Sequence, residues 1–172
     1  VAGRMFRADK KYIQYTKTEI WNRSEILHTG WMQDMCKVEC LPWMNLQEGE
    51  YSGWWFACFP MEFVQKEKPL PFFLHCDDVE YGLRLGTVPM ALNGIQVWHE
   101  TYEYRQSPVI TYYDVRNSLI TNAICGCSIG RRDLWALWTQ KLTDYLKQGN
   151  LEYYYATILG LYDFVMGTRR FY

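Results

Sequence analysis

Hydrophobic and polar positions follow a short period in the first half of the chain and helical spacing in the second half. Alternation predicts half-buried strands, whereas apolar residues three or four positions apart predict helices. The expected strands or extended stretches are residues 1–6, 12–21, 51–59, 72–75, 88–92 and 95–98, the last two joined by a turn at Asn93-Gly94. Residues 24–50, which contain Gly30, Pro42 and Gly49, are expected to form a long loop with at most one short helix.

Helices are expected in five places. The first covers residues 61–68 and is closed by Pro69 and Pro71, and the second opens at residues 77–84. The other three are residues 112–124, an apolar stripe over 134–146 that ends near Gly149, and residues 151–166, which Gly167 terminates. The pattern therefore predicts an α/β region followed by an all-α region.

Size and charge exclude several classes of protein. A chain of 172 residues makes one domain or a large piece of a bigger one, and Val1 opens a predicted strand, so we expect the chain to start inside a fold. Lysine and arginine (18) balance aspartate and glutamate (19), which argues against a nucleic-acid partner. No apolar run approaches the roughly 20 residues of a membrane span. The six cysteines form no CxxC motif, so reduced thiols are expected rather than a zinc site.

Aromatic residues are the unusual feature of the composition. They make 17% of the chain, enough either to build the core or to line a site for ring-shaped ligands. Trp54 and Trp55 are adjacent, and neighbours on a strand point to opposite faces. One of them could therefore stack on a sugar while the other packs beneath a helix; packing of both between sheet and helices is an equally good alternative.

Two neighbouring acids, Asp77 and Asp78, stand at a predicted strand-to-helix junction. Adjacent carboxylates repel each other, and a carboxylate at such a position can accept a proton or hold a cation. The alternative is a helix cap with a first-turn acid, which stabilises a helix by about 1 kcal/mol. Glu80 and Arg84 are four positions apart and are expected to pair on the helix surface.

His99 is the second candidate because it follows a predicted strand that ends in Val97-Trp98. A histidine at the carboxyl end of a strand can reach a ligand held at that edge of the sheet, and imidazole could complete the ligand shell of a divalent metal. The alternative, which the residues alone favour, is a hydrogen-bonded loop histidine.

The order of these features resembles the polymerising galactofuranosyltransferases of bacteria, which are inverting, metal-dependent GT-A glycosyltransferases of family 2. The resemblance runs from residue 1 to about residue 125 and rests on Gly53-Trp54-Trp55, Pro69-Leu70-Pro71, Asp77-Asp78-Val79-Glu80-Tyr81-Gly82-Leu83-Arg84, Trp98-His99 and Tyr112-Tyr113-Asp114-Val115-Arg116-Asn117. It implies an α/β GT-A fold, with the acceptor-side half of a mixed sheet in residues 1–128 and a C-terminal helical extension in residues 129–172.

The resemblance also implies roles for individual residues. Asp78 would be the general base that deprotonates the acceptor hydroxyl, and Asp77 would orient hydroxyl groups. His99 would complete the shell of a Mn²⁺ or Mg²⁺ ion on the donor diphosphate. The implied substrate-binding residues are Trp54, Trp55, Glu19 and Arg116.

The implied partners are a UDP-sugar donor, UDP-galactofuranose in the first place, and a glycan or lipid-linked acceptor of the cell envelope. A cytoplasmic location with peripheral contact at the inner membrane face is expected, to which Arg169 and Arg170 could contribute.

The chain departs from the family pattern at several points. The Asp-x-Asp metal motif of the family precedes the strand that matches residues 1–6, so no turnover is expected from this chain alone. Cys76 stands where the family has tryptophan, and Asp114 where it has histidine. Two alternatives remain open. One is a non-catalytic carbohydrate-binding remnant, and the other is a metal-dependent hydrolase that would need ligands beyond Asp77, Asp78 and His99.

Overall fold

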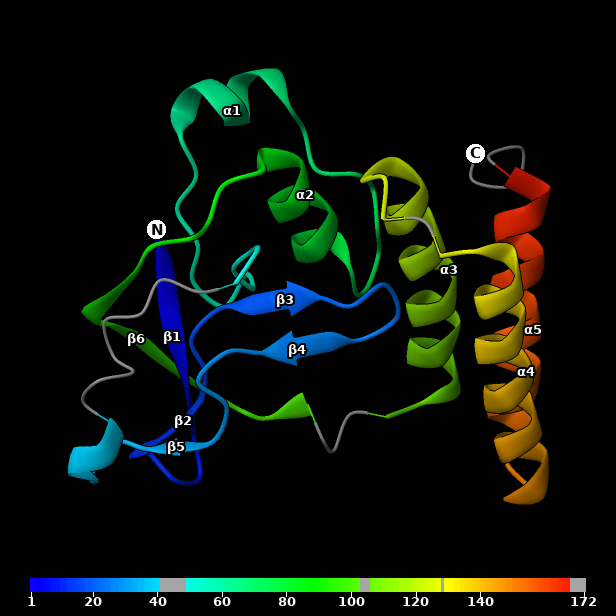
Figure 1. Ribbon diagram of the computed structural model, residues 1–172, viewed down its shortest axis with the longest axis horizontal. Helices are drawn as coiled ribbons and strands as arrows, with labels where there is room; N and C mark the ends of the chain where they lie inside the picture. Colours follow the sequence, from blue (N-terminus) through cyan, green and yellow to red (C-terminus); the bar gives the residue numbers. More distant parts are fainter. Residues whose placement is uncertain (41–48, 103–105, 128, 168–172) are drawn as a thin grey trace. The chain divides into compact units, whose positions relative to one another are not determined.

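The computed structural model describes residues 1–40, 49–102, 106–127 and 129–167 (Figure 1). Pro42 of the expected loop and Arg169-Arg170 lie outside the described residues. Contacts along the chain divide it into two compact units. We call them the sheet unit, residues 1–70 and 78–104, and the helical unit, residues 71–77 and 105–172. The predicted α/β region followed by helices is confirmed, whereas the predicted boundary after residue 128 stays a prediction.

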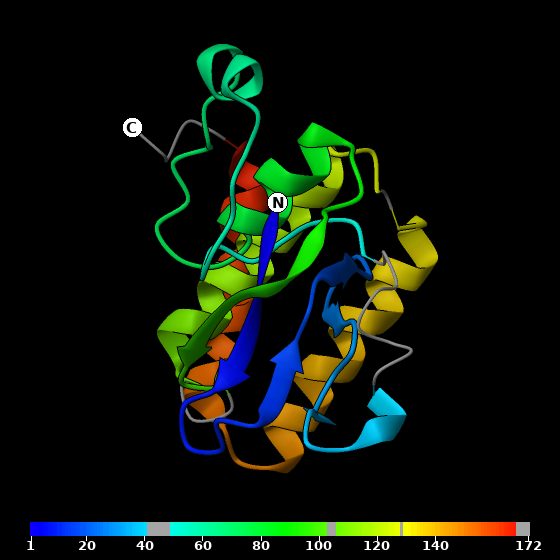
Figure 2. The same cartoon turned by 90° about the vertical axis from the view of Figure 1, so that its left-hand side faces the viewer.

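A four-stranded mixed sheet with the order β5-β2-β1-β6 forms the centre of the sheet unit. β1 pairs in parallel with β6 and antiparallel with β2, so it lies between these two strands, as Figure 2 shows. A separate antiparallel pair is made by β3 and β4 (Figure 1). The strands are β1 (Ala2–Arg7), β2 (Ile13–Thr16), β3 (Glu19–Trp21), β4 (Ile26–His28), β5 (Gln33–Asp34) and β6 (Ala91–His99).

The predicted extended stretch 12–21 is confirmed as two strands that belong to different sheets. The change of sheet is fixed by threonine hydroxyls: Thr16 Oγ1 donates to the Thr18 carbonyl at 2.9 Å, and the hydroxyls of Thr18 and Thr29 lie 2.7 Å apart. The expectation of a loop for residues 24–50 is wrong at β4 and β5. These strands of three and two residues are too short to display an alternating pattern.

The strand predicted for residues 51–59 is also wrong. Only Tyr51 and Ala57 make bridges, to Glu19 and Ala2 respectively, and a turn at Trp54-Trp55 separates them. The aromatic residues of this segment, which suggested a strand, make side-chain contacts instead.

The hairpin predicted around Asn93-Gly94 is a single strand with a bulge. Ala2 pairs with Ala91 and Arg4 pairs with Gln96, so β6 holds extra residues between these two positions. Gly94 has φ +85°, and the Arg4 guanidinium donates to the Asn93 side-chain oxygen at 2.6 Å. The Asn-Gly pair therefore bends one strand rather than reversing the chain.

All five predicted helices are present: α1 (Met61–Lys66), α2 (Asp77–Leu85), α3 (Pro108–Ile124), α4 (Arg131–Lys147) and α5 (Leu151–Met166). α3 begins earlier than predicted because the Ser107 side chain caps it, accepting from the Ile110 amide at 3.2 Å, and a proline occupies its first turn. Within the described ranges, no helix is long and apolar enough to cross a membrane.

The helical unit has its own hydrophobic core between α3, α4 and α5. Val115 and Leu119 of α3 are buried beside Trp138 of α4. Gly160 allows α5 to approach α3 closely, because a Cβ at this position would lie 2.9 Å from the Tyr112 carbonyl oxygen. The partly buried residues packed on this core are Leu134, Leu137, Leu161 and Phe164.

Candidate functional site

The two predicted catalytic acids stand in the first turn of α2, where the positive end of the helix dipole favours negative charge. Asp78 Oδ1 accepts a hydrogen bond from the Val79 amide at 2.8 Å. This contact joins neighbouring residues, so it is not an N-cap bond, in which the side-chain oxygen accepts from the amide two or three positions later. Both carboxylates are partly buried, and α2 places them at adjacent positions, Asp77 in the helical unit and Asp78 in the sheet unit.

The strand predicted for residues 72–75 is absent, and a left-handed corner takes its place before α2. His75 and Cys76 have φ values of +61° and +63°, a region that residues other than glycine seldom occupy. The side chain of Asn117 in α3 donates to the carbonyls of Leu74 at 2.6 Å and of His75 at 2.9 Å. These carbonyls are therefore unavailable to a sheet partner, which explains why no strand forms.

Two further contacts connect the corner to α3. His75 Nδ1 lies 2.6 Å from a carboxylate oxygen of Asp114, and both side chains are partly exposed. Cys76 Sγ lies 3.7 Å from the Ser118 hydroxyl in a buried position. The two positions at which the chain departs from the family pattern, Cys76 and Asp114, are thus both contact points of this corner.

Trp54 lies against α2 in an aromatic cluster that we define as Trp54, Phe59, Phe63 and Tyr81. Its ring stands edge-on to Tyr81 at 5.8 Å and to Phe59 at 6.5 Å. Tyr81 also contacts Phe59 at 5.0 Å and Phe63 at 4.9 Å. Since Tyr81 is three positions after Asp78, the two residues share one side of α2. The structure therefore brings Trp54 to the side of the helix that carries Asp78.

A hollow of about 270 Å³ lies beside this cluster, lined by Trp54, Ala57 and Phe59. Trp54 is 39% exposed, so part of its ring remains open to a ligand. Aromatic faces of this kind can bind the apolar side of a ring-shaped molecule.

Trp55 points elsewhere. Its indole N–H donates to the Gly3 carbonyl of β1 at 2.7 Å, and its ring lies against Gly53 so closely that a Cβ there would come within 2.0 Å. The adjacent tryptophans therefore differ: Trp54 is exposed beside a hollow, and Trp55 joins the turn to the central sheet. The substrate-binding role expected for both stays a prediction.

Arg84 holds the segment after α1 against α2. Its guanidinium bonds to Glu80 and Glu67 and donates to the Lys68 carbonyl at 2.7 Å. The expected Glu80–Arg84 pair is confirmed, but not as a surface pair: Glu80 is fully buried, whereas the Arg84 side chain is 21% exposed. Burial would lower the pKa of Arg84, but its bond to Glu80 and the charges of both glutamates raise it.

Glu19, expected near the donor sugar, is only 2% exposed. Its carboxylate lies 2.9 Å from His28 Nδ1, and the two residues are register partners in the β3–β4 pair. The His28 ring packs 5.0 Å from the ring of Tyr15. This pairing could not be predicted from the sequence, because strands of three residues carry too few positions to establish a register.

His99 ends β6, as predicted for a residue at the carboxyl edge of the sheet. Its Nδ1 lies 2.6 Å from the Glu100 carbonyl oxygen, and its ring stacks on Tyr102 at 5.6 Å. Among the described residues, no group of three or more His, Cys, Asp or Glu side chains could hold a metal ion. The residues described around His99 thus do not by themselves make a metal site, and its metal role stays a prediction.

Arg116 is 8% exposed within the helical unit. It donates to the Tyr112 hydroxyl at 3.1 Å and to Asn117 Oδ1 at 3.0 Å, and its guanidinium lies 4.9 Å from the centre of the Tyr113 ring. Tyr112 in turn donates to Asp163 of α5 at 2.8 Å; burial and this bond raise the pKa of Tyr112. Arg116 thus orients Asn117 and links α3 to α5, and the expected role in substrate binding stays a prediction.

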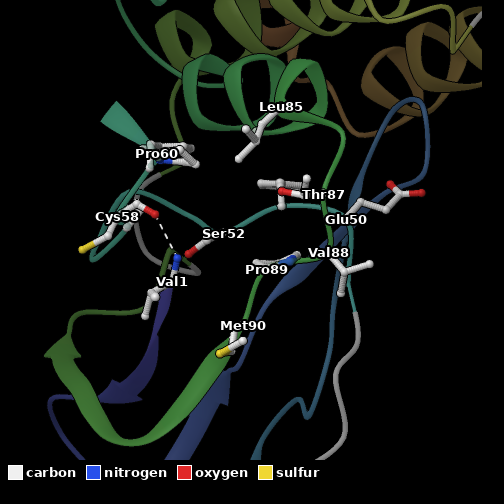
Figure 3. Close-up of a pocket in the computed structure, with 14 residues that line it drawn as sticks. Val1, Glu50, Ser52, Cys58, Pro60, Leu85, Thr87, Val88, Pro89 and Met90 are labelled. Atoms are coloured by element: carbon white, nitrogen blue, oxygen red, sulfur yellow. Dashed lines mark hydrogen bonds between the residues drawn. The ribbon is translucent and has the colours of Figure 1, made fainter. Parts of the chain in front are cut away.

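A second cavity in the sheet unit, of about 210 Å³, has a largely apolar wall that includes Leu85, Val88 and Met90 (Figure 3). The Val1 amino group at its edge donates to the Cys58 carbonyl at 2.9 Å. None of the predicted site residues lines this cavity.

Comparison with known proteins gives a partial match. No family model matches the chain. The chain is 31% identical over 81 residues to the galactofuranosyltransferase GlfT2 of Mycolicibacterium smegmatis and to that of Mycobacterium tuberculosis. Each match covers 44% of this chain and only 12% or 13% of the relative. The mixed α/β architecture with C-terminal helices is compatible with a glycosyltransferase fold. The partial matches support a glycosyltransferase relationship for this chain.

Proposed function

We propose that this chain is part of a glycosyltransferase that moves a hexose, galactofuranose in the first place, from a UDP-sugar to a cell-envelope glycan or lipid-linked acceptor. The observation that carries the proposal is the similarity to two galactofuranosyltransferases over 81 residues. The chain spans about an eighth of these relatives, so the activity proposed belongs to the whole protein that contains it.

Asp78 is the proposed general base. In an inverting transfer the acceptor hydroxyl attacks the anomeric carbon, and its proton passes to a carboxylate within hydrogen-bond reach. Asp78 is suited to this step because it is partly buried rather than enclosed, in the first turn of α2. The helix dipole favours its ionised form, which is the form that a base requires.

Trp54 is the proposed acceptor platform. It stands beside Tyr81, which shares a side of α2 with Asp78, so a sugar stacked on Trp54 would have its hydroxyl groups near that helix. Trp55 supports this platform through its bond to Gly3.

Mn²⁺ or Mg²⁺ remains the proposed cofactor of the whole protein, with His99 as one ligand. The described residues do not supply the rest of a ligand shell, and no step of the proposed mechanism is assigned to the metal. A bound divalent ion would neutralise the departing diphosphate.

The proposal is tested by measuring release of UDP from UDP-galactofuranose by the full-length protein, with a glycan acceptor and with or without Mn²⁺. Asp78→Asn is expected to lower the rate by at least about a hundredfold, the usual contribution of a general base. Asp133→Asn is the matched control, because Asp133 is also a first-turn acid, in α4. His99→Ala is expected to weaken donor binding only when metal is present.

Equal rates for wild type, Asp78→Asn and Asp133→Asn would contradict the role of Asp78. Saccharide binding by a folded protein that releases no UDP, with or without metal, would instead support the carbohydrate-binding alternative.

A further inference from the structure

We propose that Asn117 is a positioning residue: it holds the left-handed corner at His75-Cys76 and thereby fixes how Asp77 and Asp78 enter α2. This inference deepens the proposed function and rests on it for the role of the acids. The corner itself is a property of the helical unit and can be tested without any transfer assay.

The backbone of the corner is in a conformation that costs free energy. His75 and Cys76 are consecutive, and both have positive φ. A side chain with a Cβ is disfavoured in this region, and two such residues in succession remain there only when surrounding contacts hold them. Neither residue is glycine, so the local sequence does not favour the conformation that the chain adopts.

Hydrogen bonds of the Asn117 side chain offset this free-energy cost. Asn117 is fully buried, and every polar atom of its side chain has a partner. Its amide nitrogen donates to two successive carbonyls, those of Leu74 and His75, and its oxygen accepts from Arg116 Nε. Only a primary amide supplies two donors and an acceptor in this arrangement. Arg116 fixes the orientation of the amide, since the guanidinium can only donate.

The corner leads directly into the two acids of α2. Asp77 follows Cys76 directly and is the first residue of α2. If the corner relaxed to ordinary backbone angles, the backbone at Asp77 would change with it. The Asn117 side chain bonds to Leu74, His75 and Arg116, so we infer that it acts on the acids through the backbone.

Amide hydrogen exchange of the full-length protein, read over residues 74–80, tests the corner. Asn117→Ala is expected to speed exchange there by about tenfold, because the partly buried carbonyls of Leu74 and His75 lose their donor. Adding Cys76→Gly should restore slow exchange, because glycine adopts positive φ without a steric cost. Adding Cys76→Ala removes the same thiol but keeps the cost, so it should not restore slow exchange. Asn122→Ala, which removes a buried amide elsewhere on α3, is the control for general loss of stability.

Unchanged exchange over residues 74–80 in Asn117→Ala, or equal rescue by glycine and alanine, would overturn the proposal. If Asn117→Ala does not fold, Cys76→Gly and Cys76→Ala are compared as single variants that keep Asn117. Residues 74–80 should then exchange about tenfold more slowly in Cys76→Gly than in Cys76→Ala. Equal rates would overturn the claim that the corner is strained.

Transfer kinetics test the link to the acids separately. In the same variants, kcat should fall by about tenfold in Asn117→Ala with the KM for the donor unchanged, and Cys76→Gly should restore it. Altered exchange with an unchanged kcat would overturn the positioning role. Absence of transfer in the wild type would contradict the proposed function while the exchange results still decide whether the corner is held by Asn117.

Discussion

The ring of Trp54 stands edge-on to the ring of Tyr81, with 5.8 Å between centroids and 80° between planes. This contact joins a turn that carries a predicted sugar platform to the helix that carries a predicted base. Since Trp54 keeps 39% of its surface exposed while Tyr81 is buried, the contact fixes one edge of the indole and leaves the rest open.

The two adjacent tryptophans are expected to respond differently to replacement. Trp54→Ala should weaken saccharide binding by about tenfold while lowering the free energy of unfolding by only about 1 kcal/mol, since its ring is half open. Trp55→Ala should cost about 2–3 kcal/mol, because it removes packing on Gly53 and the bond to Gly3. Urea unfolding and saccharide titration by calorimetry measure the two effects. Equal losses of stability would contradict the division of roles.

Arg84→Ala is expected to destabilise the protein by about 3 kcal/mol, because it leaves the fully buried Glu80 carboxylate without its guanidinium. Arg84→Lys should recover only part of this, since a single ammonium cannot serve Glu80, Glu67 and the Lys68 carbonyl together. Glu67→Gln is the control: its side chain is 49% exposed, and its loss should cost less than about 1 kcal/mol. Similar losses in Glu67→Gln and Arg84→Ala in urea unfolding would refute this expectation.

Gly160→Ala should destabilise the protein, although alanine is the better helix former by about 1 kcal/mol. The added Cβ would lie 2.9 Å from the Tyr112 carbonyl oxygen and 3.0 Å from Val115 Cβ, so α5 must move away from α3. We expect a net loss of about 1–2 kcal/mol in the free energy of unfolding. A gain in stability on thermal unfolding would mean that the two helices do not approach this closely.

Asp9 is expected to titrate at unusually low pH. The hydrogen bond from Arg7, followed by the charge of that guanidinium, lowers the pKa of Asp9 from 3.8 to about 2. Because the folded-state pKa is the lower one, the pair stabilises the fold above pH 3.8, and this contribution is lost as the pH falls through about 2. NMR titration of the Asp9 carboxyl carbon measures the midpoint. Arg7→Lys should shift it upward, and an unchanged midpoint would show that Arg7 is not the cause.

Helices could be predicted from the sequence because each carries its own signal. Leu151–Met166 repeats apolar residues at helical spacing over four turns and ends at Gly167, which has the positive φ of a terminating glycine. α3 begins before the predicted start at residue 112, because Ser107 caps it and Pro108 is tolerated in its first turn.

Strands were less predictable, because contacts with distant residues determine whether a segment joins a sheet. The run at 72–75 has strand-like residues, but Asn117, which lies far along the chain, takes two of the carbonyls that a sheet would use. Asn93-Gly94 has the composition of a hairpin turn, yet Arg4 binds the asparagine side chain and the strand continues.

Features of the candidate site also differ in how far they could be predicted from the sequence. Trp54 is exposed, but it lies in a turn and not on the strand from which the opposite faces of the tryptophan pair were expected. The burial of Glu80 and the Glu19–His28 contact depend on segments distant in sequence. No spacing rule connects residue 19 with residue 28 unless the register of a three-residue strand pair is already known.

The bulge at Asn93-Gly94 also bears on the chemical lifetime of the protein. Both residues are exposed, and the missing side chain of Gly94 leaves its backbone nitrogen unhindered next to the asparagine amide, the arrangement from which deamidation proceeds. The Gly94 nitrogen attacks the asparagine amide carbon and ammonia leaves; water then opens the cyclic imide to aspartate or isoaspartate. The aspartate product would place a carboxylate where Arg4 now binds a neutral oxygen. Ageing to aspartate at this position would therefore create an ion pair between the edge strand and β1, and a preparation would acquire a more acidic species.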